Sequence, residues 1–340
     1  MKKKKKSSVK KQGFFVKFII IVFIIALLLI GSVVGIFYKL FKTPNLISEN
    51  KIVLVNRGEN LSRISRDLEK QGIIRYSKLF LYTAKILKGR NIHIKSGEYI
   101  FETGITPERV LEKLMQGKVY YRKLTIAEGL SSHTILTILK NTNTLIGNVP
   151  ENIVEGSLLP ETYTYTRGES RKSVIKRMQK AMQEFLNSKW EKRDKSIPVK
   201  TKQEVLVLAS IVERETGILG ERGKVASVFV NRLRIGMRLQ SDPTVVYAFT
   251  NGNKTLERSI RISDLQRKSP FNTYKIYGLP PTPIANPGKE AIQAVLNPSQ
   301  TEYLFFVATG NGGHNFSKKL RDHINFVNSY KKVLKQKTKK

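Results

Sequence analysis

Residues 205–216 read VLVLASIVERET, and this stretch decides how the C-terminal half of the chain folds. From Val205 to Val212 there is no charged residue and no alternation of apolar and polar side chains. A helix that is apolar on every side is buried in a domain core, so we expect a central helix with other elements packed around it. Two carboxylates, Glu213 and Glu215, follow the apolar run directly.

The position of Glu213 favours a general acid. By helical spacing it shares a face with Leu206 and other core residues, so partial desolvation is expected to raise its pKa. A carboxyl that stays protonated near neutral pH can donate a proton in catalysis. Glu215 lies about 200° around the helix, too far for the two to share a proton. The structural alternative is that Glu213 only ends the helix and pairs with Arg232 or Arg238.

Outward from this helix, the pattern predicts a mainly helical α+β domain over residues 151–334. The central helix is expected to be capped by Thr201, to break at Gly217 and to resume as far as Arg234. Residues 240–286 are rich in Pro and Gly, and long irregular segments of this kind are commonly functional. The other expected elements are helices at 170–190, 289–296 and 316–334 and a strand at 303–308.

Residues 51–150 predict a small α+β region. A strand at 51–55 precedes a helix capped by Asn60, and Thr106-Pro107 begins a later helix. Residues 52–74 resemble a LysM-like module, a small sugar-binding βααβ unit of cell-wall proteins. Plain packing of a strand on a helix produces the same pattern, so glycan binding by this divergent region stays open.

The N-terminus predicts a transmembrane helix at residues 18–38. These 21 residues carry no charge, and at 1.5 Å per residue the helix is about 31 Å long, which matches a bilayer. Eight lysines and no acid stand in the basic tail, residues 1–17, so that end is expected in the cytoplasm and the following body across the membrane. A cleaved signal peptide is the alternative, but its apolar run would be about 7–15 residues and would end in small side chains.

We therefore expect an uncleaved single-pass anchor in the cytoplasmic membrane. A linker at 39–50 would join it to the extracytoplasmic body, and residues 335–340 form a second basic tail. Because the span supplies attachment and no core, deletion of residues 1–41 is expected to leave a folded, soluble body.

The charge balance indicates a polyanionic partner. The chain has 61 Lys and Arg against 26 Asp and Glu, and the two basic ends account for eight and six of the net +35, leaving +21 for residues 18–330. Outside the cytoplasm the available polyanions are envelope polymers and lipid headgroups, so no nucleic-acid partner is expected. A solvated basic face that binds nothing is the alternative.

Several classes of chemistry are excluded or disfavoured. The absence of cysteine rules out disulfides, thiolate metal sites and thiol catalysis. The four histidines show no clustered spacing, so no metal site is expected. The glycine-rich segments at 217–224 and 310–313 depart from the phosphate-loop and dinucleotide patterns, and no cofactor is expected.

Four long motifs resemble the endolytic murein transglycosylase family, also called YceG-like. They are LASIVERET (208–216), KVASVFVNRLRIGMRLQSDPTVVY (224–247), NTYKIYGLPPTPIANPG (272–288) and YLFFVATGNGGHNF (303–316). The resemblance implies a carbon–oxygen lyase that cuts nascent peptidoglycan strands internally, between N-acetylmuramic acid and N-acetylglucosamine, and so terminates glycan elongation. Its products end in 1,6-anhydro-N-acetylmuramic acid. Glycan strands, the membrane and peptidoglycan synthases are the partners it suggests.

The family's catalytic glutamate maps onto Glu213. One carboxyl suffices, because the sugar's own C6 hydroxyl attacks the anomeric carbon, whereas ordinary glycosidases use two carboxyls. If Asp242 acted as a second carboxyl, the enzyme would be a hydrolase. Polar residues inside the motifs are expected to line the substrate cleft: Asn231, Arg238, Gln240, Ser241, Asp242, Thr244, Tyr247, Asn272, Tyr274 and His314.

Two readings from other classes compete with this one. A non-catalytic wall-binding or scaffold protein would keep the fold without the activity. A membrane-tethered nucleic-acid binder would need the basic body in the cytoplasm, against the lysine distribution. The chain departs from the family pattern at Ser157-Leu158-Leu159, where bulkier aromatic residues are frequent, so local substrate contacts there are in doubt.

Overall fold

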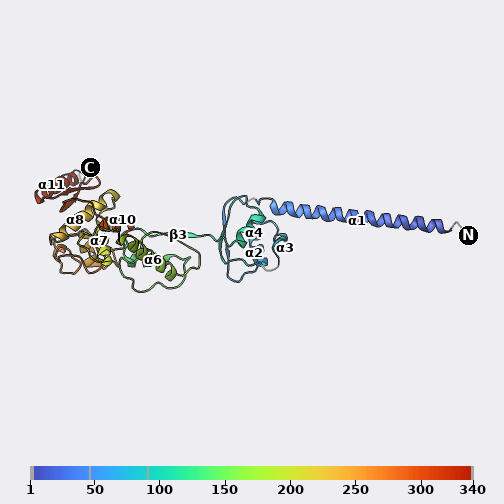
Figure 1. Cartoon of the computed structure of the whole chain (residues 1–340), viewed down its shortest axis with the longest axis horizontal. Helices are drawn as coiled ribbons and strands as arrows, with labels where there is room; N and C mark the ends of the chain where they lie inside the picture. Colours follow the sequence, from blue (N-terminus) through green and yellow to red (C-terminus); the bar gives the residue numbers. More distant parts are fainter. Residues whose placement is uncertain (1–3, 46, 90–91, 338–340) are drawn as a thin grey trace. The chain divides into compact units, whose positions relative to one another are not determined.

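The computed structural model describes residues 4–45, 47–89 and 92–337. It divides into two compact units, residues 1–121 and 122–340, and each is described by itself. The outermost residues of both expected basic tails, 1–3 and 338–340, lie outside the described residues. The structure confirms a mixed α and β fold with an apolar helix at the N-terminus (Figure 1).

The first unit begins with α1 (Lys4–Lys42), a single long helix. Its segment Phe14–Lys42 is long and apolar enough to cross a membrane, and its most apolar window is not buried in protein. By length and composition this segment fits a membrane anchor or a signal sequence alike.

The C-terminal end of α1 is part of the core of the first unit. Phe41 is 3% exposed, and its ring lies 6.2 Å from that of Phe80. Just beyond the helix, Asn45 is buried, with its side-chain amide donating to the Ile73 carbonyl and its backbone N–H to that of Ile105. Deletion of residues 1–41 would therefore remove a core side chain, contrary to the expectation from sequence.

The rest of this unit is a strand–helix–helix–strand arrangement followed by one more helix. Its elements are β1 (Lys51–Val55), α2 (Leu61–Lys70), α3 (Ser77–Lys88), β2 (Gly97–Phe101) and α4 (Pro107–Met115). β1 and β2 pair antiparallel, and the predicted caps Asn60 and Thr106 accept hydrogen bonds at the starts of α2 and α4. The LysM-like resemblance of this region and its glycan binding both stay predictions.

The second unit is mainly helical, with two short antiparallel strand pairs. Its elements are β3 (Arg122–Thr125), α5 (Ser132–Asn141), β4 (Thr162–Tyr165), α6 (Arg171–Trp190), α7 (Lys202–Glu215), η1 (Leu219–Glu221), α8 (Arg222–Arg234), α9 (Asp242–Thr250), η2 (Asp264–Gln266), α10 (Lys289–Leu296), β5 (Phe305–Ala308), β6 (His314–Ser317) and α11 (Leu320–Lys337). β3 pairs with β4, so the boundary expected near residue 150 lies inside this unit.

The central helix α7 forms as predicted. Every residue from Val205 to Val212 is buried, and α8 and α10 pack against the helix (Figure 1). Thr201 and Glu204 form a capping box that satisfies the first backbone N–H groups. The all-round apolar run therefore sits in the core, and the residues that follow it are held at the end of a rigid helix.

Two expectations for the second unit were wrong in detail. The Pro/Gly-rich stretch 240–286 contains the helix α9, whose first turn holds Asp242 and Pro243, residues typical of a helix start. The last helix begins at Leu320 and not at residue 316, because residues 314–317 form β6 and supply β5 with its hydrogen-bonded neighbour.

We predict that Phe41→Ala destabilises the first unit by about 3–5 kcal/mol, because a buried aromatic ring is removed from a packed core. Hydrogen exchange of the β1 and β2 amides in the detergent-solubilised full chain measures this. Phe37→Ala is the matched control, since Phe37 lies one turn earlier and is 46% exposed. Equal loss of protection in the two variants would contradict the placement of Phe41 in the core.

Candidate active site

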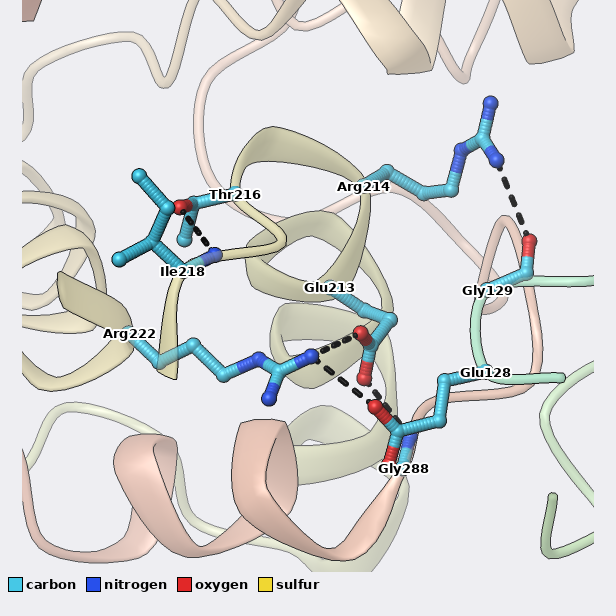
Figure 2. A network of polar contacts seen from close by, with 8 residues as sticks. All are labelled: Glu128, Gly129, Glu213, Arg214, Thr216, Ile218, Arg222 and Gly288. Carbon is cyan, nitrogen blue, oxygen red and sulfur yellow. Dashed lines mark hydrogen bonds and ion pairs between the residues drawn. The ribbon is translucent and has the colours of Figure 1, made fainter. Parts of the chain in front are cut away.

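Glu213 is held in a buried ion pair at the end of α7. Its Oε1 accepts a hydrogen bond from Nη2 of Arg222 at 2.8 Å, and its Oε2 accepts one from the Gly288 N–H at 2.8 Å (Figure 2). The same Nη2 donates to Oε2 of Glu128 at 3.0 Å. The side chains of Glu213 and Arg222 are 4% and 6% exposed. The predicted alternative partners Arg232 and Arg238 are not the ones that bind it.

Opposing forces act on the Glu213 carboxyl. Burial raises its pKa and the charge of Glu128 acts in the same direction, whereas the Gly288 N–H and Arg222 lower it. Gly288 is also the N-cap of α10, so the carboxylate compensates the positive end of that helix. Both carboxyl oxygens are therefore engaged by donors that favour the ionised form.

Gly288 lies close against Glu128. A Cβ there would be 1.8 Å from Oε1 of Glu128, so a side chain at this turn would require the Glu128 carboxylate to move away from Arg222. Arg214, the residue after Glu213, points the other way and donates to the Gly129 carbonyl at 3.4 Å (Figure 2). Glu213 thus ties α7 to the starts of α8 and α10.

Glu215 lies in a different environment from Glu213. Its Oε1 accepts a hydrogen bond from the Ser241 hydroxyl at 2.5 Å. Burial and the nearby charge of Asp242 raise the pKa of Glu215 to about 7, against the opposing effects of Ser241, Arg232 and Arg214. Within the described residues, the second carboxyl oxygen of Glu215 has no hydrogen-bond donor.

Three of the predicted cleft residues surround this carboxyl or adjoin it. Ser241 is buried beside it, and exposed Asp242 accepts a hydrogen bond from the Tyr274 hydroxyl at 2.6 Å. We call Glu215, Ser241, Asp242 and Tyr274 the Glu215 cluster. Arg232 adds a buried positive charge whose guanidinium donates to the carbonyls of Leu239 and Leu304. The cluster thus combines a carboxyl with a raised pKa and a second carboxyl, and the Arg232 guanidinium lies close enough to act on the first.

A pocket of about 480 Å³ is lined by Arg214 of α7 and Pro243 of α9. Arg214 stands between Glu213 and Glu215 in the sequence, but neither glutamate side chain lines the pocket. His133, Thr134, Tyr247 and the backbone near Gly252 also line it. The pocket has the mixed aromatic and polar lining that suits a sugar ring.

A third carboxyl, the half-buried Glu155, bonds to Tyr247 of the pocket wall. It accepts hydrogen bonds from the Ser132 backbone N–H at 2.8 Å and from the Asn286 amide at 2.9 Å. Burial raises the pKa of Glu155, and Tyr247 forms a hydrogen bond to it. Burial and this carboxyl raise the pKa of Tyr247 to about 12, so Tyr247 stays neutral and is held in place.

Two further predicted cleft residues support the Glu215 cluster from below or beside it. Thr244 is fully buried, and its hydroxyl bonds the Ser241 carbonyl at 2.6 Å and the Thr273 hydroxyl at 2.8 Å. Gln240 is exposed with φ +50°, and its N–H donates to the Thr273 carbonyl. A non-glycine residue at positive φ immediately before Ser241 is uncommon backbone geometry.

The other four predicted cleft residues bind protein groups, and one of them, Asn272, also accepts a hydrogen bond from the Tyr274 N–H of the cluster. Asn231 donates to the carbonyls of residues 301 and 303, and Asn272 to those of residues 265 and 267. The Arg238 guanidinium lies 4.6 Å from the Tyr277 ring centre, and His314 Nδ1 lies 2.7 Å from Oε2 of Glu221. These contacts position loops and strands.

Sequence reasoning missed Glu128, Arg222 and Glu155. Arg222 lies beyond a loop from Glu213, and no periodicity links the two across it. The burial of Glu215 could have been predicted from the sequence, because a helix that is apolar all round buries the face of Glu215 as well as that of Glu213. Desolvation was predicted for Glu213 alone, whereas burial raises the pKa of both carboxyls and their partners differ. Among the described residues, no group of His, Asp and Glu has the arrangement of a metal site.

Comparison with known proteins gives a consistent result. A sequence profile described as the YceG-like family matches residues 53–329. The chain is 32% identical over 299 residues to an endolytic murein transglycosylase of Bacillus subtilis, covering 78% of this chain and 81% of that protein. It is 27% identical over 327 residues to an endolytic murein transglycosylase of Streptococcus pneumoniae, of which it covers 58%.

A crystal structure of a yceG-like protein from Listeria monocytogenes is also similar. The sequence identity is 30%, the TM-score is 0.49, and the match covers 82% of this chain and 99% of that one.

The raised pKa of Glu215 predicts a pH-dependent stability. Between its ordinary pKa of 4.5 and the folded value of about 7, the folded protein binds more protons than the unfolded chain. The free energy of unfolding therefore falls as pH rises through this window, by roughly 3 kcal/mol. Glu215→Gln should lack this fall and be more stable than the wild type at pH 8. Denaturant midpoints of both proteins at pH 5 and pH 8 measure it, and parallel pH dependence in the two would contradict it.

Proposed function

The chain belongs to the YceG-like family, and we propose that it is a membrane-anchored lytic transglycosylase that cuts peptidoglycan strands internally. The names of its relatives support the reaction class, since they are endolytic murein transglycosylases. In the proposed reaction the bond between N-acetylmuramic acid and N-acetylglucosamine is cleaved. The new end is 1,6-anhydro-N-acetylmuramic acid, and elongation of that strand stops.

The Glu215 carboxyl carries this proposal. It is a carboxyl with a pKa raised to about 7, at the end of a rigid helix, close to the charge of Asp242, and with one oxygen that accepts no hydrogen bond from the described residues. A general acid needs a raised pKa and a free oxygen that can reach the leaving group. The pKa of both glutamates is raised, so it is the oxygen without a donor that favours Glu215 over Glu213 as the proton donor.

Glu213 remains the alternative, because the family motif maps onto it and its pKa is also raised. To act as the acid it would have to release either the Arg222 guanidinium or the Gly288 N–H, each at 2.8 Å. We propose that Glu213 is instead a positioning residue. Its ion pair holds the end of α7, and with it Glu215, at a constant place relative to the pocket.

In the proposed reaction the Glu215 carboxyl first donates one proton to the substrate and then accepts one from it. Protonated Glu215 donates its proton to the glycosidic oxygen as the bond from that oxygen to the anomeric carbon breaks. The sugar's C6 hydroxyl oxygen then bonds to the anomeric carbon, and its proton passes to the Glu215 carboxylate. The acid is regenerated and no water is consumed. The positive charge of Arg232 and the hydroxyl of Ser241 would stabilise the carboxylate between the two transfers.

The glycan strand is proposed to cross the pocket beside the Glu215 cluster. Tyr247 offers a ring face and is held rigidly by Glu155, while Thr134 and His133 offer polar contacts. The exposed carboxylate of Asp242, fixed by Tyr274, would lie near the developing positive charge of the sugar. A second role for Asp242 as a base for water would make the enzyme a hydrolase.

The anchor and the location are also proposals. The apolar helix α1 would remain uncleaved, with residues 1–17 in the cytoplasm and both folded units outside. Membrane lipids and peptidoglycan synthases are the proposed partners of an enzyme placed there. A wall-binding scaffold without activity is the competing function.

Glutamine substitutions separate the two glutamates and test the enzyme itself. Glu215→Gln keeps the size and the bond to Ser241 but cannot deliver a proton, so the rate of glycan cleavage should fall by about 10²–10⁴-fold. Wild-type cleavage should decline as pH rises above about 7, because the acid is then ionised. The rate of release of anhydro ends from purified glycan strands, measured by mass spectrometry, checks both.

Glu213→Gln is the matched variant on the other face of α7. It should lose less activity than Glu215→Gln and keep the wild-type pH profile. The reverse ranking would assign the acid to Glu213. Reducing ends in the wild-type digest would indicate hydrolysis, and Asp242→Asn would then be the variant expected to stop it. If the wild-type protein binds glycan without cutting it, the result would support the competing function, a wall-binding scaffold.

A reporter fused after residue 340 tests the topology. We expect a reporter that is active only outside the cytoplasm to be active on the full chain, because eight lysines precede the apolar helix and hold its N-terminus inside. A fusion to the chain without residues 1–38 is the control and should be inactive. Activity of a cytoplasm-only reporter on the full chain would reverse the proposed orientation.

A further inference from the structure

The helix α3 of the first unit is apolar on two faces, and only one of them is covered by the core. Phe80 and Ala84 are buried against the rest of the unit. On the other face, Tyr82 and Ile86 are 62% and 82% exposed, and Leu79 continues the same row at helical spacing. Contiguous exposed apolar side chains of this size mark a surface that meets a partner or a membrane.

This second face forms one wall of an apolar groove of about 860 Å³. The other wall is the last two turns of α1, including Val34, Phe37 and Tyr38. Both walls belong to the first unit, and α1 contacts α3 and α4 there. Phe41 of α1 packs on Phe80 of α3, so this contact holds the two walls of the groove together.

The groove lies at the level where α1 would leave the membrane. The uncharged run of α1 ends at Tyr38 and is about 31 Å long, so it fills the hydrocarbon layer. Val34 to Tyr38 are then at the boundary of that layer. Tyr76 and Tyr82 line the groove together with these residues of α1, and tyrosine is enriched at membrane interfaces. The exposed Lys78 and Lys85 on α3 suit anionic headgroups.

We propose that the exposed face of α3 is embedded in the interface of the bilayer that α1 spans, with lipid chains filling the groove. The occupant is therefore lipid and not a second protein. This inference rests on the proposed anchor and goes beyond the proposed enzymatic activity. Its consequence is that the first unit is fixed to the membrane surface at two places, α1 and α3, so it cannot tilt freely about the end of the span.

The absence of cysteine allows a direct test on the full chain. Ile86→Cys, labelled with an environment-sensitive fluorophore, is reconstituted in vesicles of phosphatidylethanolamine and phosphatidylglycerol. Quenching is measured with spin-labelled lipids and with aqueous iodide. We expect blue-shifted emission, strong quenching by shallow lipid spin labels and loss of iodide quenching. Ser62→Cys on the exposed side of α2 is the matched control, and it should show the opposite pattern.

Tyr82→Cys repeats the measurement at a second position, and circular dichroism confirms that each labelled chain is folded. Iodide quenching at Ile86 equal to that at Ser62 would overturn the proposal. So would protection from both quenchers, which would indicate a second copy or another protein in the groove. Leu28→Cys, in the middle of the span, tests the anchor separately. If Leu28 is reached only by deep lipid labels and Ile86 by none, the inference fails and the anchor stands; if neither is reached, the anchor fails too.

Discussion

The buried contact of Glu213 with Arg222 and Gly288 determines how the second unit is assembled. It joins the end of α7 to the first residue of α8 and to the N-terminus of α10. Removing one partner of such a pair leaves an uncompensated charge in a site with almost no water, which commonly costs about 3–5 kcal/mol. The main effect of the Glu213 carboxylate is therefore to fix the positions of these helix ends. The apolar core of α7 supplies the packing free energy, and this ion pair specifies the arrangement of the helix ends.

The proposed chemistry depends on the same helix end. Two residues further along, Glu215 faces Ser241 and Asp242, where burial and a like charge favour the protonated form. The two glutamates thus have different environments because α7 turns them to different sides. Glu213 has both oxygens bonded to donors, whereas burial raises the pKa of Glu215 to about 7. Pairs of carboxyls separated in this way allow one to build the site while the other carries out acid–base chemistry.

The first unit includes the end of α1 in its packing. Phe41 is a core residue of the folded unit although it belongs to the helix that carries the apolar segment. That segment and the small α+β fold are therefore continuous, and the orientation of α3 follows that of α1. If α1 spans a bilayer as proposed, this continuity would give the uncovered apolar side of α3 a defined depth at the boundary of that bilayer.

The sequence by itself determined the apolar N-terminal helix, the buried central helix with its Thr201 cap, the mixed α and β fold and the family. All of these depend on local composition, periodicity or long motifs. Tertiary structure alone decided the partners: Arg222 for Glu213, Ser241 for Glu215, and Phe80 for Phe41. It also showed that the predicted cleft residues separate into the Glu215 cluster and loop anchors. The physical reason is that a carboxyl's protonation depends on charges and donors brought close by distant segments, and no helical spacing encodes them.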